Sequence, residues 1–128
     1  MTMATPRFST NLSLRVAEGE IVALMGSNGA GKTTLARLLC ALDRPSAGSI
    51  TVAGLPVSSS KHGKRPRALT RKERAALRRN VGYVMQHPER QLFADTVAED
   101  VAYGPRNQHL SELEVATRVE EALRMLHI

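Results

Sequence analysis

Residues 26–33 read Gly26-Ser27-Asn28-Gly29-Ala30-Gly31-Lys32-Thr33, which matches the pattern G-x-x-x-x-G-K-[ST] in full. Glycines permit backbone angles that other residues avoid, so successive N–H groups of such a loop can point at one anion. Lys32 supplies a mobile ammonium for the outer phosphates of a nucleotide, and the Thr33 hydroxyl is placed to ligate Mg²⁺. The stretch therefore predicts a loop that binds the phosphates of a nucleoside triphosphate.

The segments on either side of this loop fit that prediction. Residues 21–25 form a continuous apolar run of strand length, which indicates a buried, parallel strand. After the loop, a helix is predicted from Lys32 to about Leu42, because leucines recur at the spacing of one helix face. The alternative is a glycine-rich turn that happens to precede a lysine. It does not account for a strand before the loop and a helix after it.

Further strands are predicted along the chain. Alternating apolar and polar residues predict strands over 12–16 and 49–53, and an apolar run predicts another over 81–85. A polar, basic loop is predicted over 58–67. The order of strand, loop, helix and later strand indicates an α/β domain.

Capping boxes predict the starts of three more helices, at Thr70, Thr96 and Ser111. The helix that follows Thr96 is predicted to stop near Gly104-Pro105. The last helix has an apolar face and, on its other side, two pairs of opposite charge one turn apart. These pairs are Glu114 with Arg118 and Glu120 with Arg124.

Composition limits the classes of protein that fit. With 128 residues, of which 42% are hydrophobic, the chain suits one domain or a piece of one. It has no apolar run of 18 or more residues, so no membrane-spanning helix is predicted. An aromatic content of 3% argues against a protein that stacks single-stranded bases. The single cysteine, Cys40, excludes an internal disulfide and is compatible with a reducing cytoplasm.

Positive charge is concentrated in one segment. Nine of the 18 basic residues and one of the 12 acidic residues lie between Lys61 and Arg79, which gives that segment a charge of +8 and the rest of the chain −2. A charge confined in this way favours a solvated insertion between two strands. Attraction to an anionic membrane surface or to nucleic acid are the alternatives, and a nucleic-acid partner is not expected.

The residues that flank the loop resemble those of ATP-binding-cassette (ABC) ATPases. The resemblance rests on residues 18–21, on residues 44–50 and on a second threonine, Thr34, after the loop; one departure is Ser27, where proline is usual. It implies an incomplete P-loop nucleoside-triphosphatase fold of the α/β class that binds ATP and Mg²⁺. The implied nucleotide-binding residues are Gly26, Ser27, Asn28, Gly29, Ala30, Gly31, Lys32, Thr33 and Thr34.

Gln86 ends an apolar strand at the place where that family keeps its Q-loop. The resemblance implies that Gln86 contacts Mg²⁺ and the attacking water, and that it senses the membrane partner. A neutral amide suits this role, because its oxygen can ligate a cation and orient water without adding charge. Lys32 and Gln86 are thus the expected catalytic residues, and Thr33 and Gln86 the expected metal ligands.

Residues 86–107 are similar to the ATPase subunits of energy-coupling-factor transporters, the cobalt/nickel and vitamin importers. This implies a transmembrane coupling subunit, a substrate-binding membrane subunit and a second ATPase subunit as partners, at the cytoplasmic face of the membrane. The substrate is then chosen by a separate subunit. The alternative is the helical subdomain of some other ABC importer's ATPase.

The resemblance extends from Leu12 to the end of the chain and corresponds to the N-terminal half of the family's domain. Residues 1–128 then form a partial ABC domain, with the P-loop at 26–34, a basic insertion at 58–79, the Q-loop around 86 and the start of the helical subdomain at 95–128.

The family's signature motif, Walker B aspartate, catalytic glutamate and switch histidine would lie beyond residue 128. His127 is not expected to be the switch, nor Phe8 the adenine platform. We therefore expect no ATP turnover from these residues alone. The rival hypothesis is a nucleotide-binding module without turnover.

Overall fold

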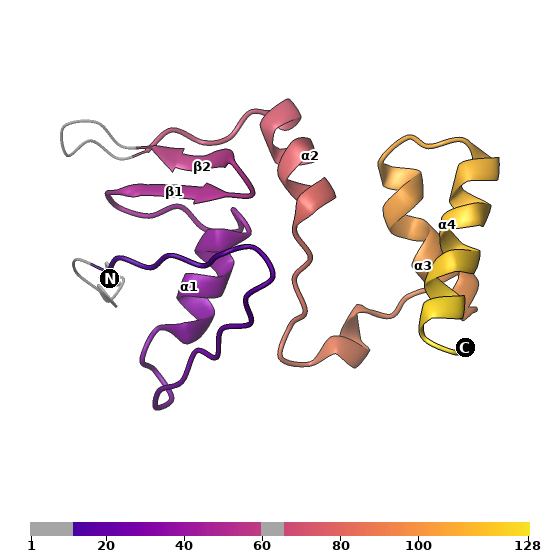
Figure 1. Ribbon diagram of the computed structural model, residues 1–128, viewed down its shortest axis with the longest axis horizontal. Helices are drawn as coiled ribbons and strands as arrows, with labels where there is room; N and C mark the ends of the chain where they lie inside the picture. Colours follow the sequence, from indigo (N-terminus) through magenta and orange to yellow (C-terminus); the bar gives the residue numbers. More distant parts are fainter. Residues whose placement is uncertain (1–11, 60–65) are drawn as a thin grey trace, which may run out of the picture. The chain divides into compact units, whose positions relative to one another are not determined.

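The computed structural model describes residues 12–59 and 66–128 and divides the chain into two units, residues 1–80 and 81–128. The first unit contains helix α1 (Lys32–Leu39), strands β1 (Ser49–Val52) and β2 (Leu55–Ser59), and helix α2 (Arg71–Asn80) (Figure 1). The second contains the 3₁₀ helix η1 (Pro88–Gln91) and helices α3 (Val97–Asn107) and α4 (Glu112–Met125).

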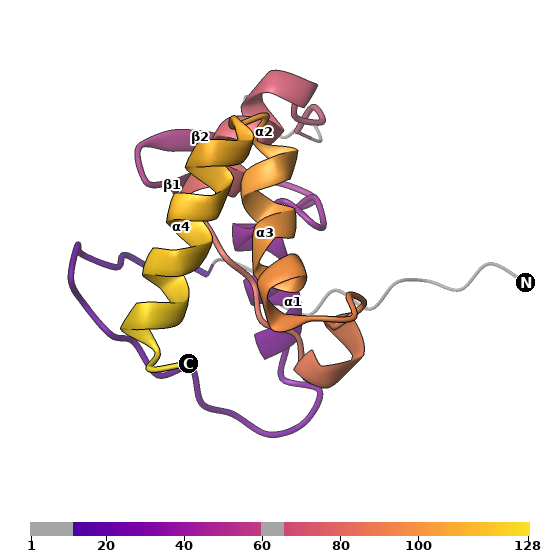
Figure 2. The same ribbon diagram turned by 90° about the vertical axis from the view of Figure 1, so that its right-hand side faces the viewer.

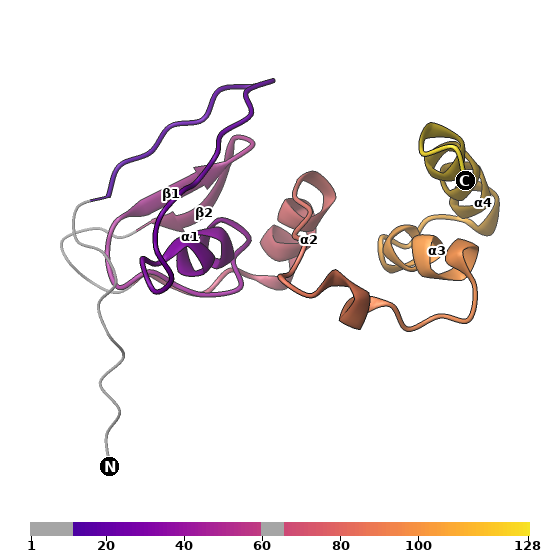
Figure 3. The same cartoon turned by 90° about the horizontal axis from the view of Figure 1, so that it is seen from below.

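The sheet of the first unit is an antiparallel hairpin of β1 and β2, with α1 lying beside it (Figures 1 and 3). Ala53 and Gly54 join the strands with φ of 50° and 74°. Positive φ at both positions is the geometry of the two-residue turn that matches strand twist. Thr51 pairs with Pro56 and Ile50 with Ser58, so Val57 is an extra residue that bulges from the ladder.

The hairpin corrects one prediction from the sequence. The strand expected over 49–53 is confirmed, but the loop expected over 58–67 is wrong at its start, since β2 continues to Ser59. Proline and serine are not typical strand residues, so the sequence of β2 does not predict a strand. Pro56 has no N–H to donate, and it is tolerated because β2 has no second neighbour among the described residues. Lys61, Lys64 and Arg65 of the basic insertion lie outside the described residues, as does Phe8.

The three other predicted strands are not formed. Residues 12–16, 21–25 and 81–85 are extended or irregular, and Ile21 and Met25 are 98% and 87% exposed. A strand needs a neighbour to accept and donate its ladder of hydrogen bonds. Within the part of the chain that the structure describes, β1 and β2 are the paired strands.

Helix α1 ends at Leu39, three residues before the predicted Leu42. The Leu42 N–H donates to the Arg37 carbonyl at 2.9 Å and the Ala41 N–H to Leu38 at 3.2 Å, while Ala41 has a φ of 55°. These bonds form a Schellman motif, in which one left-handed residue reverses the chain. The Arg37 guanidinium then pairs with the Asp43 carboxylate at 2.7 Å and lowers its pKa.

The predicted start of α2 is confirmed. The Glu73 N–H donates to the Thr70 hydroxyl at 3.2 Å, and the Thr70 N–H donates to the Glu73 carboxylate at 2.8 Å. The Arg67 guanidinium also donates to both carboxylate oxygens of Glu73. One turn further along α2, Leu77 is 2% exposed and, with Val57, is one of the few buried apolar side chains in the described part of this unit. Val57 and Leu77 both line one small pocket between β2 and α2.

Helices α3 and α4 of the second unit pack side by side (Figure 2). Ala102 of α3 and Val115 of α4 are buried. The Ser111 capping box is confirmed, as is the Glu120–Arg124 pair at 2.6 Å. The Glu114 carboxylate instead accepts from the Ser111 N–H at 3.0 Å, so it serves the cap and not Arg118.

The predictions for α3 need two corrections. Thr96 does cap the helix, because its hydroxyl accepts from the Glu99 N–H at 3.2 Å. The expected return bond from the Glu99 side chain is replaced by one from Asp100, whose carboxylate accepts from the N–H groups of Phe93 and Ala94. The helix also continues past Pro105 to Asn107. A proline this close to a helix end removes a single hydrogen bond, so the helix continues to Asn107, and the chain turns just beyond it at His109, whose φ is 59°. No helix in the described residues is long and apolar enough to span a bilayer.

The first prediction concerns the cap of α4. Ser111→Ala removes the acceptor of the Glu114 N–H and should destabilise the second unit by about 1 kcal/mol. Ser111→Asp keeps an acceptor at the N-cap and should behave like the wild type. Denaturation followed by the helical circular dichroism signal measures both. Equal loss in the two variants would contradict the role of the hydroxyl.

The second prediction concerns the Glu73 carboxylate, whose pKa is lowered from 4.5 to about 2 by the hydrogen bonds from Arg67 and then Thr70. A lowered pKa means that ionised Glu73 stabilises the fold above the unfolded-state pKa, and that this contribution disappears as the pH falls toward about 2. Glu73→Gln should therefore lower Tm near neutral pH, and the difference from wild type should vanish on acidification.

The control for that experiment is Glu121→Gln, which makes the same charge change at an exposed position of α4. It should leave Tm almost unchanged over the whole pH range. A Glu73→Gln effect that is independent of pH would contradict the ion-pair explanation.

Candidate functional site

The loop predicted to bind phosphate is a tight turn that leads into α1. The Ala30 N–H donates to the Ser27 carbonyl at 3.1 Å. Gly29 and Gly31 have φ of 84° and 95°, in the left-handed region that favours glycine. These two glycines thus supply backbone conformations that most side chains would resist. Ser27, Asn28, Gly29 and Ala30 are exposed, so the loop is open to a ligand.

Glycine is favoured at position 26 because the space beside its Cα is limited. A Cβ at this position would lie 3.2 Å from the Ala30 Cβ and 3.9 Å from the Lys32 Cδ. The missing side chain therefore lets the beginning of the loop approach its end and the stem of Lys32.

The N-terminus of α1 offers positive charge and free donors. Its N-cap is Gly31, which has no side chain to cap the helix, and the first turn contains no acidic residue. The first N–H groups of a helix have no acceptor within the helix, and the helix dipole places partial positive charge beside them. Lys32, Thr33 and Thr34 occupy this turn. Such a terminus favours a phosphate group.

The Lys32 ammonium is held against the loop that precedes it. Its Nζ donates to the carbonyl oxygens of Gly26 and of Ser27, the latter at 3.1 Å. An ammonium has three donors, so at least one remains for a phosphate oxygen. The structure thus gathers in one place the side-chain cation, the loop and the helix N-terminus.

Thr33 is the predicted metal ligand in this unit. It is exposed in the first turn of α1. A hydroxyl oxygen fits Mg²⁺, which keeps several waters and is commonly bound through few protein groups together with substrate phosphates. In the described part of the chain no group of three or more His, Cys, Asp or Glu side chains gathers as a metal site. The hydroxyl oxygen of Thr33 fits a Mg²⁺ brought in with a nucleotide.

Gln86 lies in the second unit, exposed and just before η1. Lys32 belongs to the first unit and Gln86 to the second.

An aromatic pair in the second unit was not expected from the sequence. The rings of Phe93 and Tyr103 meet edge to face, with centroids 4.8 Å apart. Both residues are exposed, as are Leu92 and Val97. We call the Phe93–Tyr103 pair the aromatic patch. Phe93 precedes α3 and Tyr103 lies in its middle. The spacing of the two residues matches neither a helix nor a strand period, so no sequence pattern predicts that their rings meet.

Comparison with known proteins places this loop in a family. The family model for ABC transporters matches residues 9–128. An ABC transporter ATP-binding protein of Bifidobacterium longum is 67% identical over 92% of this chain and 16% of its own length. The cobalt import ATP-binding protein CbiO of Rhodobacter capsulatus is 45% identical, over 92% of this chain and 39% of its own.

A third relative is the energy-coupling factor transporter ATP-binding protein EcfA2 of Methanospirillum hungatei. It is 42% identical over 94% of this chain and 27% of its own length. The chain thus spans less than half the length of each of these relatives. No solved structure matches the chain significantly. The family match covers nearly the whole chain and includes the loop described above, so this protein belongs to the ABC transporter ATP-binding proteins.

Proposed function

We propose that this chain is the nucleotide-binding part of an ATPase subunit that powers uptake through an energy-coupling-factor type transporter. The observation that carries the proposal is the arrangement at residues 26–34, where Lys32 is bonded to the loop that opens α1. The transporter type is supported by the identity to a cobalt import ATP-binding protein and to an energy-coupling factor ATP-binding protein. The alternative is the ATPase of another ABC importer.

The residues of the loop would act on the nucleotide in distinct ways. Backbone N–H groups of the loop and of the α1 terminus would hold the phosphate oxygens, and Lys32 would offset the charge on the outer phosphates. Thr33 and Gln86 would hold Mg²⁺, which when bound offsets phosphate charge and orients the reacting groups. Gln86 would also orient the attacking water through its neutral amide.

Partner subunits follow from the same proposal. An exposed apolar cluster such as the aromatic patch is a common feature of protein interaction sites. We infer that the second unit contacts the transmembrane coupling subunit, which keeps the protein at the cytoplasmic face of the membrane beside the substrate-binding membrane subunit. A second ATPase subunit would complete each nucleotide site.

We also infer that residues 1–128 by themselves bind ATP without turning it over. The family resemblance assigns the Walker B aspartate and the catalytic glutamate to later parts of the domain, and the relatives extend well beyond the matched region. General-base assistance typically contributes 10²–10⁴-fold to a rate. A phosphate-release assay on this chain, with Lys32→Ala as control, tests the inference, and turnover that depends on Lys32 would contradict it.

The third prediction tests nucleotide binding. Lys32→Ala should weaken ATP binding by about ten- to a hundredfold, because a hydrogen bond to a charged group contributes about 1.5–3 kcal/mol. Lys72→Ala makes the same charge change at an exposed position of α2 and should leave affinity unchanged. Titration with a fluorescent ATP analogue measures both. Equal affinities in the two variants would overturn the proposal.

The fourth prediction separates binding from hydrolysis. Gln86→Ala should leave ATP affinity nearly unchanged, since the phosphates are held in the first unit, and should slow hydrolysis in the assembled transporter. Gln91→Ala, at an exposed position of η1, is the matched control and should do neither. A loss of affinity as large as that of Lys32→Ala would show that Gln86 has a different role.

A further inference from the structure

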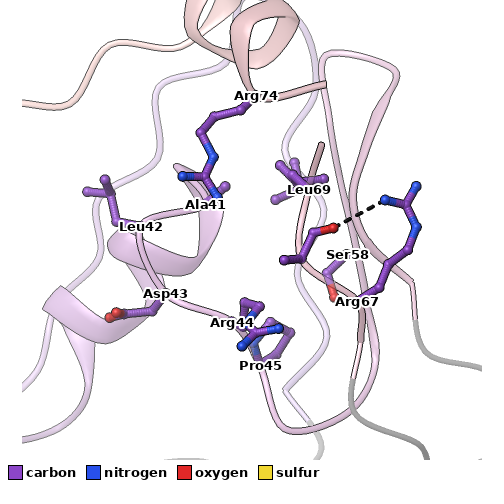
Figure 4. Close-up of a pocket in the computed structure, with 11 residues that line it drawn as sticks. Ala41, Leu42, Asp43, Arg44, Pro45, Ser58, Arg67, Leu69 and Arg74 are labelled. Atoms are coloured by element: carbon purple, nitrogen blue, oxygen red, sulfur yellow. Dashed lines mark hydrogen bonds between the residues drawn. The ribbon is translucent and has the colours of Figure 1, made fainter. Parts of the chain in front are cut away.

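The first unit contains a pocket that is separate from the loop at residues 26–34. It has a volume of about 420 Å³ and lies between the end of α1, strand β2 and the beginning of α2 (Figure 4). Arg44, Arg67, Arg74 and Ser58 are among the residues that line it, and none of its lining residues belongs to the phosphate loop. We call it the arginine pocket. Its size is within the range of small-molecule sites.

Two of its arginines have no counter-charge among the described residues. Glu73 pairs with Arg67 at 2.6 Å, and Arg67 also donates to the Ala68 carbonyl, the dashed line in Figure 4. Within the described part of the chain, Arg44 and Arg74 have neither an ion pair nor a side-chain hydrogen bond.

The acidic residue of the lining does not offset these charges. Asp43 is occupied by Arg37, at 2.7 Å. Figure 4 shows its carboxylate pointing away from Ser58 and Arg67. The pocket therefore presents a net positive lining.

The pocket is also lined by a buried hydroxyl, that of Ser58. Ser58 is 6% exposed, and its Oγ has no hydrogen-bond partner among the residues that the structure describes. An unpaired buried polar atom destabilises a fold, so a ligand that accepts a hydrogen bond from Ser58 would remove part of that cost. Ser58 lies on β2 next to the bulged Val57. Among the described residues, the Ser58 hydroxyl therefore lacks an acceptor, and it borders a pocket in which Arg44 and Arg74 lack an acidic partner.

We propose that the arginine pocket binds a phosphate-bearing anion, with Arg44 and Arg74 providing charge and the Ser58 hydroxyl a hydrogen bond. Guanidinium groups present planar sets of N–H donors that match phosphate oxygens. A doubly charged phosphate also matches the two uncompensated arginines better than a single carboxylate does. This site is independent of the nucleotide site and of the transporter type proposed above.

The test is phosphate titration by calorimetry, with the nucleotide site saturated by a non-hydrolysable ATP analogue. Wild type should show a phosphate-binding event that Arg74→Gln weakens about tenfold or more, as loss of a charge-assisted hydrogen bond predicts. Arg78→Gln is the matched control, with the same charge change on the same helix but outside the pocket lining. It should change affinity by no more than about twofold, as expected for an exposed charge.

Ser58→Ala gives a second, independent readout. Without phosphate it should raise Tm, because it removes an unpaired buried hydroxyl, and the rise in Tm that phosphate produces in wild type should be smaller or absent. A purely structural serine would show the first effect and not the second. Absence of binding in wild type to both inorganic phosphate and phosphatidic acid vesicles, or equal effects of Arg74→Gln and Arg78→Gln, would overturn the proposal.

A vesicle experiment distinguishes the source of the phosphate. Phosphatidylcholine vesicles with and without phosphatidic acid are tested for co-sedimentation with each variant. Binding that needs phosphatidic acid, and that Arg74→Gln loses while Arg78→Gln keeps, would support a lipid headgroup. Binding of inorganic phosphate alone would support a soluble anion. Vesicle binding that both variants weaken equally, with no binding of inorganic phosphate, would contradict the pocket and indicate general attraction to α2.

Discussion

A β-strand forms its regular ladder of hydrogen bonds only by pairing with another strand, and this requirement determines which parts of the chain are regular. The hairpin of β1 and β2 meets it locally, through a two-residue turn. Helices form their hydrogen bonds internally, with their ends closed by Thr70, Thr96 and Ser111. Residues 12–16 and 21–25 have strand-like sequence but no paired neighbour among the described residues. Local bonding therefore carries most of the observed structure.

This distinction explains how much could be predicted. The capping boxes at Thr70 and Ser111, the helix after Lys32 and the glycine conformations depend on a few neighbouring residues, and the sequence predicted them. The predicted strands at 21–25 and 81–85 depend on partners distant in sequence, and hydrophobic pattern alone could not supply those. The end of α1 depends on Ala41 adopting a left-handed conformation. Glycine or asparagine signals such an end, whereas alanine does not.

The candidate site divides in the same way. Residues 26–34 are contiguous, so the motif identifies the whole loop, including the close approach that favours Gly26. The arginine pocket joins residues far apart in sequence, and nothing in the spacing of Arg44, Ser58 and Arg74 points to a common cavity. The basic segment is also less uniform than its composition indicates, because Arg67 is paired with Glu73 while Arg74 is not paired within the described residues.

The two hydrogen bonds of the Lys32 ammonium have a consequence for the energetics of ligand capture. A free lysine side chain carries about 2 kcal/mol of rotamer entropy, which is lost when a ligand immobilises it. In this protein the bonds to Gly26 and Ser27 restrict the side chain before any ligand arrives. Much of the rotamer entropy of Lys32 is therefore lost during folding and not during ligand binding. A triphosphate would meet a preorganised cation, so more of the electrostatic attraction would appear as affinity.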